Sequence, residues 1–331
     1  MAGGLNADDR PIASLSLDAD NLWAYMKVHG DPGWEAMPSF IEPLVRHALD
    51  DLDALGLRIT WFIVGADADR KENVDALSAL VPSGHEVANH SYRHEPWLHR
   101  YSAEELETEI SRAEDAIESV TGVRTTGFRG PGYSLSTATL RVLVRRGYKF
   151  DASTLPSIVG PLARAYYMRT TQLSSDQLSD RSRLFGTWRD GIQSIAPYRW
   201  LVDGRSIIEL PITTAPGLRI PMHMSYLLML SERSPAVARS YFRAVLKACR
   251  VVGVGPSLLL HPLDFLSLED APQLGFFPSM GMPALLKRER VREYLTLFAR
   301  NFRVVPVGEH VAAISDKDLR IKVPSSGMDK T

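Results

Sequence analysis

Two histidines in one short segment stand at a spacing that suits a metal site. His90 and His94 lie four residues apart in the segment NHSYRH. On a helical turn such residues share one face, so two imidazoles could bind one metal ion. Asp20, in the segment SLDAD, offers a carboxylate as a third ligand. This donor set leaves coordination positions open for water and substrate, which is typical of a catalytic metal. One divalent ion is expected, zinc by preference, with cobalt, nickel or iron also admissible.

The elements that must position these residues are short apolar runs that alternate with amphipathic helices. Strands are expected at residues 12–17, 58–64, 85–89, 125–129, 148–151, 207–212, 257–261 and 303–307. Helices are expected at 39–56, 102–122, 137–146 and 235–251, the second of them opened by a capping box of Ser102 and Glu105. Such alternation predicts an α/β fold with a mostly parallel sheet. About eight units favour a distorted (β/α) barrel of seven to eight strands over an open doubly wound sheet.

Ionisable residues fall at the carboxyl ends of the expected strands. These residues are Asp18, Asp20, His90, His94, Arg129, Asp151 and His261. In a barrel of parallel strands the carboxyl ends share one face, where catalytic groups gather. We therefore expect these side chains to converge there.

Five segments in order resemble the motif series of the polysaccharide deacetylase superfamily, also called the NodB-homology or carbohydrate esterase family 4 group. They are SLDAD, NHSYRH, FRGPGYS, YKFDAST and LLLHP, and they extend from Asp18 to His261. Two departures, Ala19 between the aspartates and Gly132 before Tyr133, resemble the branch with peptidoglycan-deacetylase-like and allantoinase-like proteins. That branch is functionally mixed, so the exact substrate stays open.

The resemblance implies a role for each matching residue. Asp18 would be the general base, and Arg129 would orient it. Asp20, His90 and His94 would bind the metal. His261 would be the general acid, tuned by Asp151. The backbone N–H of Tyr133 or Gly132 would help to stabilise the oxyanion.

The segment 155–205 is expected to form an insert of helix and irregular loop. Its aromatic residues could stack on sugar rings or pack as a cap on the barrel; they are Tyr166, Tyr167, Trp188, Tyr198 and Trp200. The apolar run 222–230 is expected in the core, with a surface for a lipid-linked sugar as the alternative. His223 is expected to be structural, and the remaining histidines (His29, His47, His85, His99 and His310) to be non-catalytic.

The composition is that of an ordinary globular protein with 331 residues, 38 basic and 39 acidic side chains, and a net charge of -1. No overall basic field exists to attract nucleic acid.

A single cysteine, Cys249, excludes an intramolecular disulfide. With neither a signal-peptide pattern nor a run of ~20 apolar residues, we expect a cytoplasmic protein without a membrane span. One domain at 1–315 with a polar tail at 316–331 is expected.

These observations lead to one preferred function and several alternatives. The preferred function is metal-dependent hydrolysis of the N-acyl group, above all N-acetyl, of a nucleotide- or lipid-linked amino-sugar conjugate in glycan biosynthesis. The alternatives are a cyclic amidase of the allantoinase-like type, a deformylase of a lipid-linked formamido sugar, and a non-enzymatic carbohydrate-binding module. A homo-oligomer is compatible with any of them.

Overall fold

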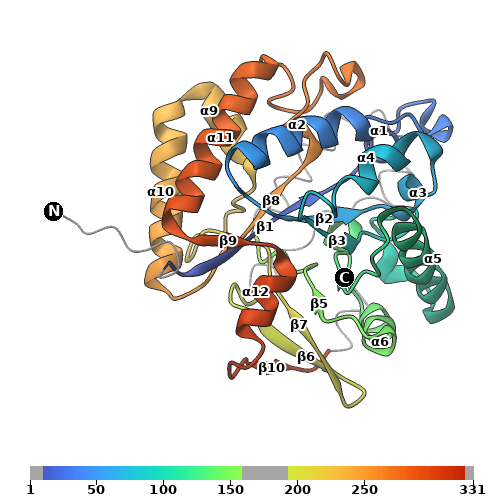
Figure 1. Ribbon diagram of the computed structural model, residues 1–331. Helices are drawn as coiled ribbons and strands as arrows, with labels where there is room; N and C mark the ends of the chain where they lie inside the picture. Colours follow the sequence, from blue (N-terminus) through green and yellow to red (C-terminus); the bar gives the residue numbers. More distant parts are fainter. Residues whose placement is uncertain (1–9, 159–192, 325–331) are drawn as a thin grey trace.

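A computed structural model describes residues 10–158 and 193–324 of the chain, and within these ranges ten strands form one sheet (Figure 1). The strands are β1 (Ile12–Asp18), β2 (Thr60–Ile63), β3 (Glu86–Asn89), β4 (Gly127–Phe128), β5 (Phe150–Asp151), β6 (Tyr198–Val202), β7 (Arg205–Glu209), β8 (Ser257–Leu260), β9 (Arg303–Val305) and β10 (Ile321–Lys322). Their order is β10-β6-β7-β5-β4-β3-β2-β1-β8, with β9 beside β1. Every expected strand is present, and β6 and β10 are additional.

The sheet is parallel except where β6 and β7 form an antiparallel hairpin. β1 has neighbours on both sides, with β9 along its first half, β2 along its second half and β8 on the other side. The sheet is open, because β8 and β10 are its two ends. The backbone after β7 partly closes it, since Thr213 donates to the carbonyl of Ser257 at 3.0 Å. The barrel-like α/β fold is thus confirmed, while the expected number of seven to eight strands was too low.

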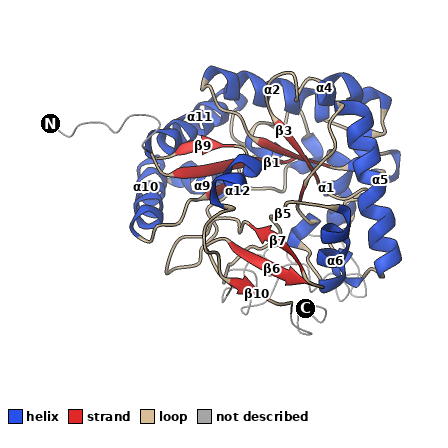
Figure 2. Ribbon diagram, turned by 60° about the horizontal axis from the view of Figure 1, so that its bottom comes forward, coloured by secondary structure: helices blue, strands red, loops and turns tan. Residues whose placement is uncertain are grey.

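Helices surround the strands, with β6 and β10 at one margin (Figure 2). The longer ones are α1 (Leu22–His29), α2 (Ile41–Ala54), α5 (Ala103–Thr121), α6 (Thr137–Arg146), α9 (Met224–Arg233), α10 (Pro235–Val251), α11 (Ala284–Asn301) and α12 (Val307–Ile314). Two short ones, α3 (Gly65–Ala68) and α4 (Val74–Ser78), follow β2. None of the helices in the described ranges combines the length and the apolarity needed to span a bilayer.

Local sequence explains where several of these helices begin and end. The expected capping box opens α5, because Ser102 accepts from the Glu105 amide and Glu105 accepts from the Ser102 amide. Ser136 caps α6 in the same way through the amide of Thr139. Both helices end at a glycine with a positive φ, Gly122 in α5 and Gly147 in α6. The backbone N–H of each glycine donates to a carbonyl of the last turn.

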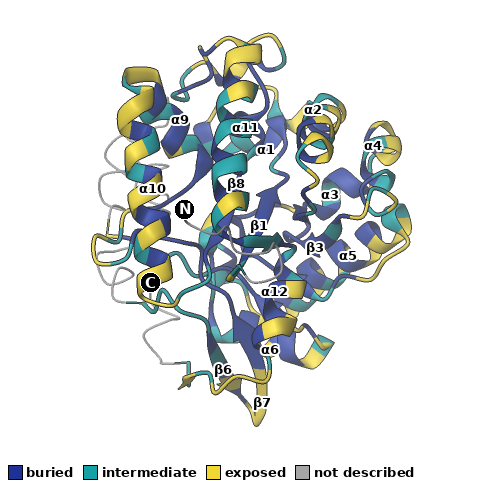
Figure 3. Ribbon diagram, turned by 60° about the vertical axis from the view of Figure 1, so that its left-hand side comes forward, coloured by how far each residue is buried: buried dark blue, intermediate teal, exposed yellow. Residues whose placement is uncertain are grey.

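The core lies between the sheet and the helices, and Figure 3 shows buried strands beneath the exposed outer faces of α10 and α2. The side chains of Leu15 and Leu17 on β1 are completely buried. The apolar run 222–230 belongs to this core, as expected, because Met222, Met224, Leu227 and Leu228 are buried within it. Cys249 is also buried.

The expected insert and tail contribute to the sheet where the structure describes them. Tyr198 and Trp200 lie on β6, are 0% and 4% exposed, and belong to a hydrophobic cluster. They are therefore unavailable for stacking on sugar rings, and for these two residues the alternative of packing holds. The tail contributes β10, which pairs with β6. Trp188, Tyr166 and Tyr167 lie outside the described residues.

Candidate active site

One carboxylate and two imidazoles meet at the carboxyl ends of β1 and β3. Oδ1 of Asp20 lies 2.9 Å from Nε2 of His94 and 3.2 Å from Nε2 of His90. The three ligand atoms all lie within 4.8 Å of one another. Because β2 pairs in parallel with both β1 and β3, the segments that follow these strands come together at one edge of the sheet.

These donors fit a divalent cation. Asp20 Oδ1 and both ring nitrogens of His94 are buried and make no hydrogen bond within the described part of the chain. Burial opposes a charge on Asp20, yet His94 and His90 hold the pKa of its carboxyl far below the ordinary value. Nδ1 of His90 lies 2.7 Å from the carbonyl oxygen of Arg129. The ring must donate there, which leaves the lone pair of Nε2 directed at the metal site.

The two histidines do not lie on a helical turn, which corrects the prediction from their spacing. Ser91 and His94 have φ values of 61° and 52°, in the left-handed region that side chains rarely adopt. Residues 90–94 form a loop that turns both imidazoles to the same side. The spacing pointed to the correct pair of ligands, whereas the backbone conformation that unites them comes from tertiary contacts.

Asp18 and Arg129 form a buried ion pair beside the ligands. Arg129 is completely buried, Asp18 is 4% exposed, and an amino group of Arg129 donates to Oδ1 of Asp18. The guanidinium also donates to Ser16 Oγ at 3.1 Å and to the carbonyl of Ala152 at 3.0 Å. Burial opposes a charge on His90, yet Asp18 and Asp20 raise its pKa. Both carboxylates therefore act on the same imidazole.

His261 follows β8 and is partly exposed at the opening of a short turn, Pro262–Asp264. The backbone N–H of His261 donates to Oδ2 of Asp264 at 2.7 Å, and Ser225 Oγ donates to Oδ1 at 2.7 Å. The turn is fixed from α11, because the buried Lys287 donates to the carbonyls of Leu263 and Leu266. Burial raises the pKa of the Asp264 carboxyl, and a positive charge on His261 lowers it.

Asp151 has different neighbours from those expected. Ser153 Oγ donates to its Oδ1 at 2.6 Å, and its second partner is the carboxyl group of Glu209 on β7. Burial raises the pKa of Asp151, while burial and the nearby Asp151 hold the pKa of Glu209 well above its usual range. The two carboxyl groups are thus buried neighbours, and the pKa of each is raised. Asp264 accepts from the His261 backbone and interacts electrostatically with that residue, and sequence reasoning missed this neighbour. The expected influence of Asp151 on His261 stays a prediction.

The expected oxyanion donors lie in the turn Pro131–Tyr133. The backbone N–H of Tyr133 donates to the carbonyl of Gly130 at 2.9 Å within this turn, and the oxyanion role stays a prediction. Gly132 has a φ of 57°, and a Cβ there would lie 2.9 Å from the side chain of Pro96. Only glycine fits this position without displacing the loop that carries His94.

His223 lies in the site, although the sequence indicated a structural role. Its ring centroid is 5.7 Å from that of His261 and 6.1 Å from that of Tyr133. Nε2 is buried without a hydrogen-bond partner among the described residues. Burial, His261 and Arg129 hold its pKa well below the ordinary value, so the ring is neutral. No sequence signal distinguished this histidine from the others.

Tyr25 on α1 was also missed. Its hydroxyl is buried with no hydrogen bond to any described residue. Burial raises its pKa well above the usual value, and the charges of Asp20, Asp264 and Asp18 add to this rise. The hydroxyl therefore lies near carboxylates that end or follow the adjacent strands β1 and β8, between the metal-ligand side of the site and the His261 side.

Comparisons with known proteins agree with this arrangement. Residues 31–150 match the family model for polysaccharide deacetylase. A peptidoglycan deacetylase-like protein of Gibberella zeae is 32% identical over 126 residues, which cover 38% of this chain and 35% of that protein. The peptidoglycan deacetylase of Helicobacter pylori is 29% identical over 113 residues, covering 34% of this chain and 36% of the bacterial protein. The chain thus matches about a third of the length of either relative.

A crystal structure from Mycobacterium smegmatis described as a polysaccharide deacetylase has the same fold. Its TM-score is 0.64 at 19% identity, and the match covers 98% of this chain and 96% of that one. The family match includes His90, His94 and Arg129, whereas Asp18, Asp20 and His261 lie outside it. Residues 31–150 are thus similar to polysaccharide deacetylases, and the chain as a whole has the fold of the solved mycobacterial structure.

Proposed function

We propose that this protein is a metal-dependent hydrolase that removes the N-acetyl group from an amino sugar. The observation that carries the proposal is the meeting of Asp20, His90 and His94 next to the buried pair of Asp18 and Arg129. A site that only bound sugar would need neither three facing metal ligands nor a carboxylate held beside them.

Asp20, His90 and His94 would hold the metal. When bound, a divalent ion there lowers the pKa of water and polarises the acyl oxygen. Asp18 accepts the proton of the attacking water as general base. Arg129 directs the Asp18 carboxylate, because Ser16 and Ala152 fix the guanidinium on its other sides.

His261 provides the proton that the leaving amine needs, since an amide nitrogen cannot depart as an anion. Asp264 and Lys287 fix the turn that begins at His261. The neutral ring of His223 lies beside His261, where its free Nε2 can form a hydrogen bond with the substrate.

We further propose that the substrate is a nucleotide- or lipid-linked N-acetylhexosamine used in glycan assembly, in the cytoplasm. The single buried cysteine, which leaves no intramolecular disulfide, supports this location. Zinc is the proposed metal, on the basis of two imidazoles and one carboxylate as ligands.

Release of acetate from a panel of N-acetylhexosamine conjugates tests the proposal. Purified protein loaded with Zn²⁺ should release acetate, and a chelator should abolish this activity. Asp18→Asn should lower kcat about 10²- to 10⁴-fold with its metal content unchanged. His94→Ala should lose both metal and activity. Release of formate alone would favour a deformylase, and hydrolysis of cyclic imides alone would favour a cyclic amidase; either result would reject N-deacetylation.

A further inference from the structure

The loop that carries both histidine ligands has a partner for each of its backbone N–H groups. Ser91 donates to Oδ1 of Asn89 at 2.8 Å, and His94 donates to Oγ of Ser91 at 3.2 Å. Tyr92 donates to Oε1 of Glu109 at 3.0 Å, and Arg93 donates to the same oxygen. Two carbonyls are also engaged, because Gly65 donates to Ser91 and Ala66 donates to Tyr92 at 2.9 and 3.0 Å.

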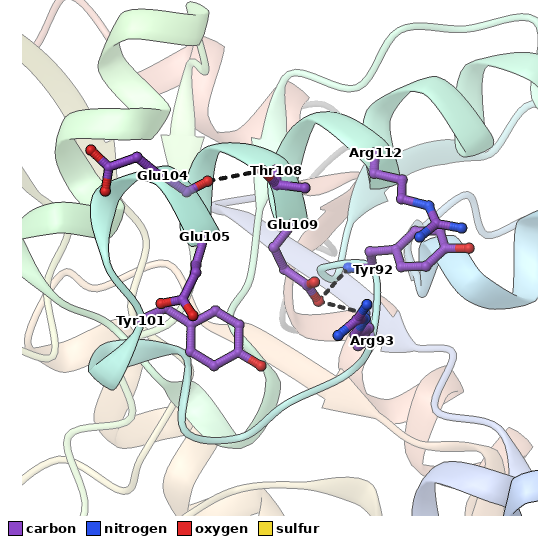
Figure 4. Close-up of a pocket in the computed structure, with 8 residues that line it drawn as sticks. All are labelled: Tyr92, Arg93, Tyr101, Glu104, Glu105, Thr108, Glu109 and Arg112. Atoms are coloured by element: carbon purple, nitrogen blue, oxygen red, sulfur yellow. Dashed lines mark hydrogen bonds between the residues drawn. The ribbon is translucent and has the colours of Figure 1, made fainter.

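Glu109 differs from the other side chains that accept these bonds, because it lies outside the loop and its flanking strand. It projects from α5 and is only 5% exposed (Figure 4). α5 is a firm support, with 19 residues and a capping box at its start. It also packs closely on α3, since a Cβ on Gly65 would lie 2.7 Å from the backbone of Ala113.

Without Glu109, two consecutive amides would lose their acceptor in a loop with two residues in the left-handed region. Such a backbone persists only where its surroundings fix it, and an unsatisfied buried amide is unfavourable. The two amides lie between His90 and His94, so their displacement changes the separation of the two imidazoles. An acceptor on a separate helix therefore holds the backbone between the two histidine ligands.

We propose that Glu109 is a positioning residue that sets metal affinity by fixing the loop between His90 and His94. The proposal rests on the proposed metal site. It requires only an acceptor oxygen at this place and not a negative charge, since both of its bonds come from neutral amides. A glutamine at position 109 should therefore preserve the metal affinity, and an alanine should not.

The dissociation constant for Zn²⁺, measured by competition with a chelator on the full-length protein, tests this inference. Glu109→Ala should bind Zn²⁺ about 10- to 100-fold more weakly than the wild type, the range seen when groups that orient metal ligands are removed. Glu109→Gln should stay within about threefold of the wild type, because its amide oxygen still accepts both bonds. Hydrogen exchange of the segment 91–94 should accelerate in Glu109→Ala and not in Glu109→Gln.

Asp51→Ala is the matched control for general destabilisation. Asp51 is a completely buried carboxylate on α2, and its partners Arg288 and Arg292 belong to α11. This variant should be less stable but should bind Zn²⁺ as the wild type does. If Glu109→Ala does not fold, Glu109→Asp shortens the reach to the amides and should weaken Zn²⁺ binding severalfold.

A cavity of about 350 Å³ borders Glu109 and provides the alternative outcome. It is lined by Tyr92, Arg93, Tyr101, Glu104, Glu105, Thr108, Glu109 and Arg112. If water from this cavity replaces the carboxylate, a folded Glu109→Ala will bind Zn²⁺ as tightly as the wild type, and the inference is overturned. If the wild type itself binds no Zn²⁺ and His94→Ala changes nothing, the proposed function fails instead.

Discussion

Arg129→Met should destabilise the protein more than any substitution of a surface arginine. The variant keeps much of the side-chain volume and removes the charge that faces Asp18, which is 4% exposed. Removing one partner of a buried ion pair costs about 3–5 kcal/mol, because the other charge remains buried and unpaired. Adding Asp18→Asn to Arg129→Met removes that lone charge, so the double variant should regain about 2 kcal/mol of unfolding free energy. Neither variant should retain more than about 1% of the activity, because both lack an ordered base.

Denaturant unfolding at neutral pH measures these free energies. A chelator should be present in every sample, so that metal binding does not contribute to stability. Arg46→Met is the control, since Arg46 pairs with Glu42 on the exposed surface of α2 at 3.3 Å. It should cost less than about 1 kcal/mol. If Arg129→Met is as mild as this control, or if the double variant is less stable than Arg129→Met alone, the argument from the buried ion pair is refuted.

Three further predictions concern other buried groups. Burial lowers the pKa of both His85 and His310 to about 4. Between pH 6.5 and pH 4 the unfolded chain therefore binds protons at these residues that the native protein does not bind. The free energy of unfolding should fall over this range by up to about 3 kcal/mol per histidine. The variant His85→Gln/His310→Gln should show a flatter dependence of the denaturation midpoint on pH, and an unchanged slope would contradict this account. Lys287→Met should cost about 2 kcal/mol in thermal unfolding, because two buried carbonyls lose their donor; a change below 0.5 kcal/mol, about the size of a surface substitution, would show that those bonds are dispensable. His223→Phe should lower kcat/KM for acetate release about 10- to 100-fold with metal content unchanged, whereas wild-type kinetics would exclude a substrate contact.

Much of the fold was predictable because it depends on local sequence. The expected range 137–146 matches α6, since Ser136 and Gly147 determine the two ends of that helix through their own side chain and backbone. The strand pattern gave a parallel sheet, and parallel strands place their carboxyl ends at one edge. β6 was missed because its aromatic residues pack on neighbours distant in the sequence, and Tyr198 and Trp200 therefore looked like ligand-stacking residues.

The functional site was also only partly predictable from the sequence. Asp151 ends β5 and Asp264 lies in the turn after β8, both between apolar residues, and their neighbours in space distinguish them. Asp151 pairs with Glu209 from another strand, whereas Asp264 is three residues from His261 and accepts its N–H. A carboxylate that follows a histidine closely in the chain was a usable signal for Asp264. No comparable signal existed for His223.

The sequence by itself determined the donor types, their order and their placement after strands, because each of these is a property of adjacent residues. Only the tertiary structure decided how the donors face one another. His90 and His94 face Asp20 because a strained loop is held by Glu109 from a separate helix. A buried N–H donates to whichever oxygen the packed elements bring to it, and this choice is made in space and not along the chain.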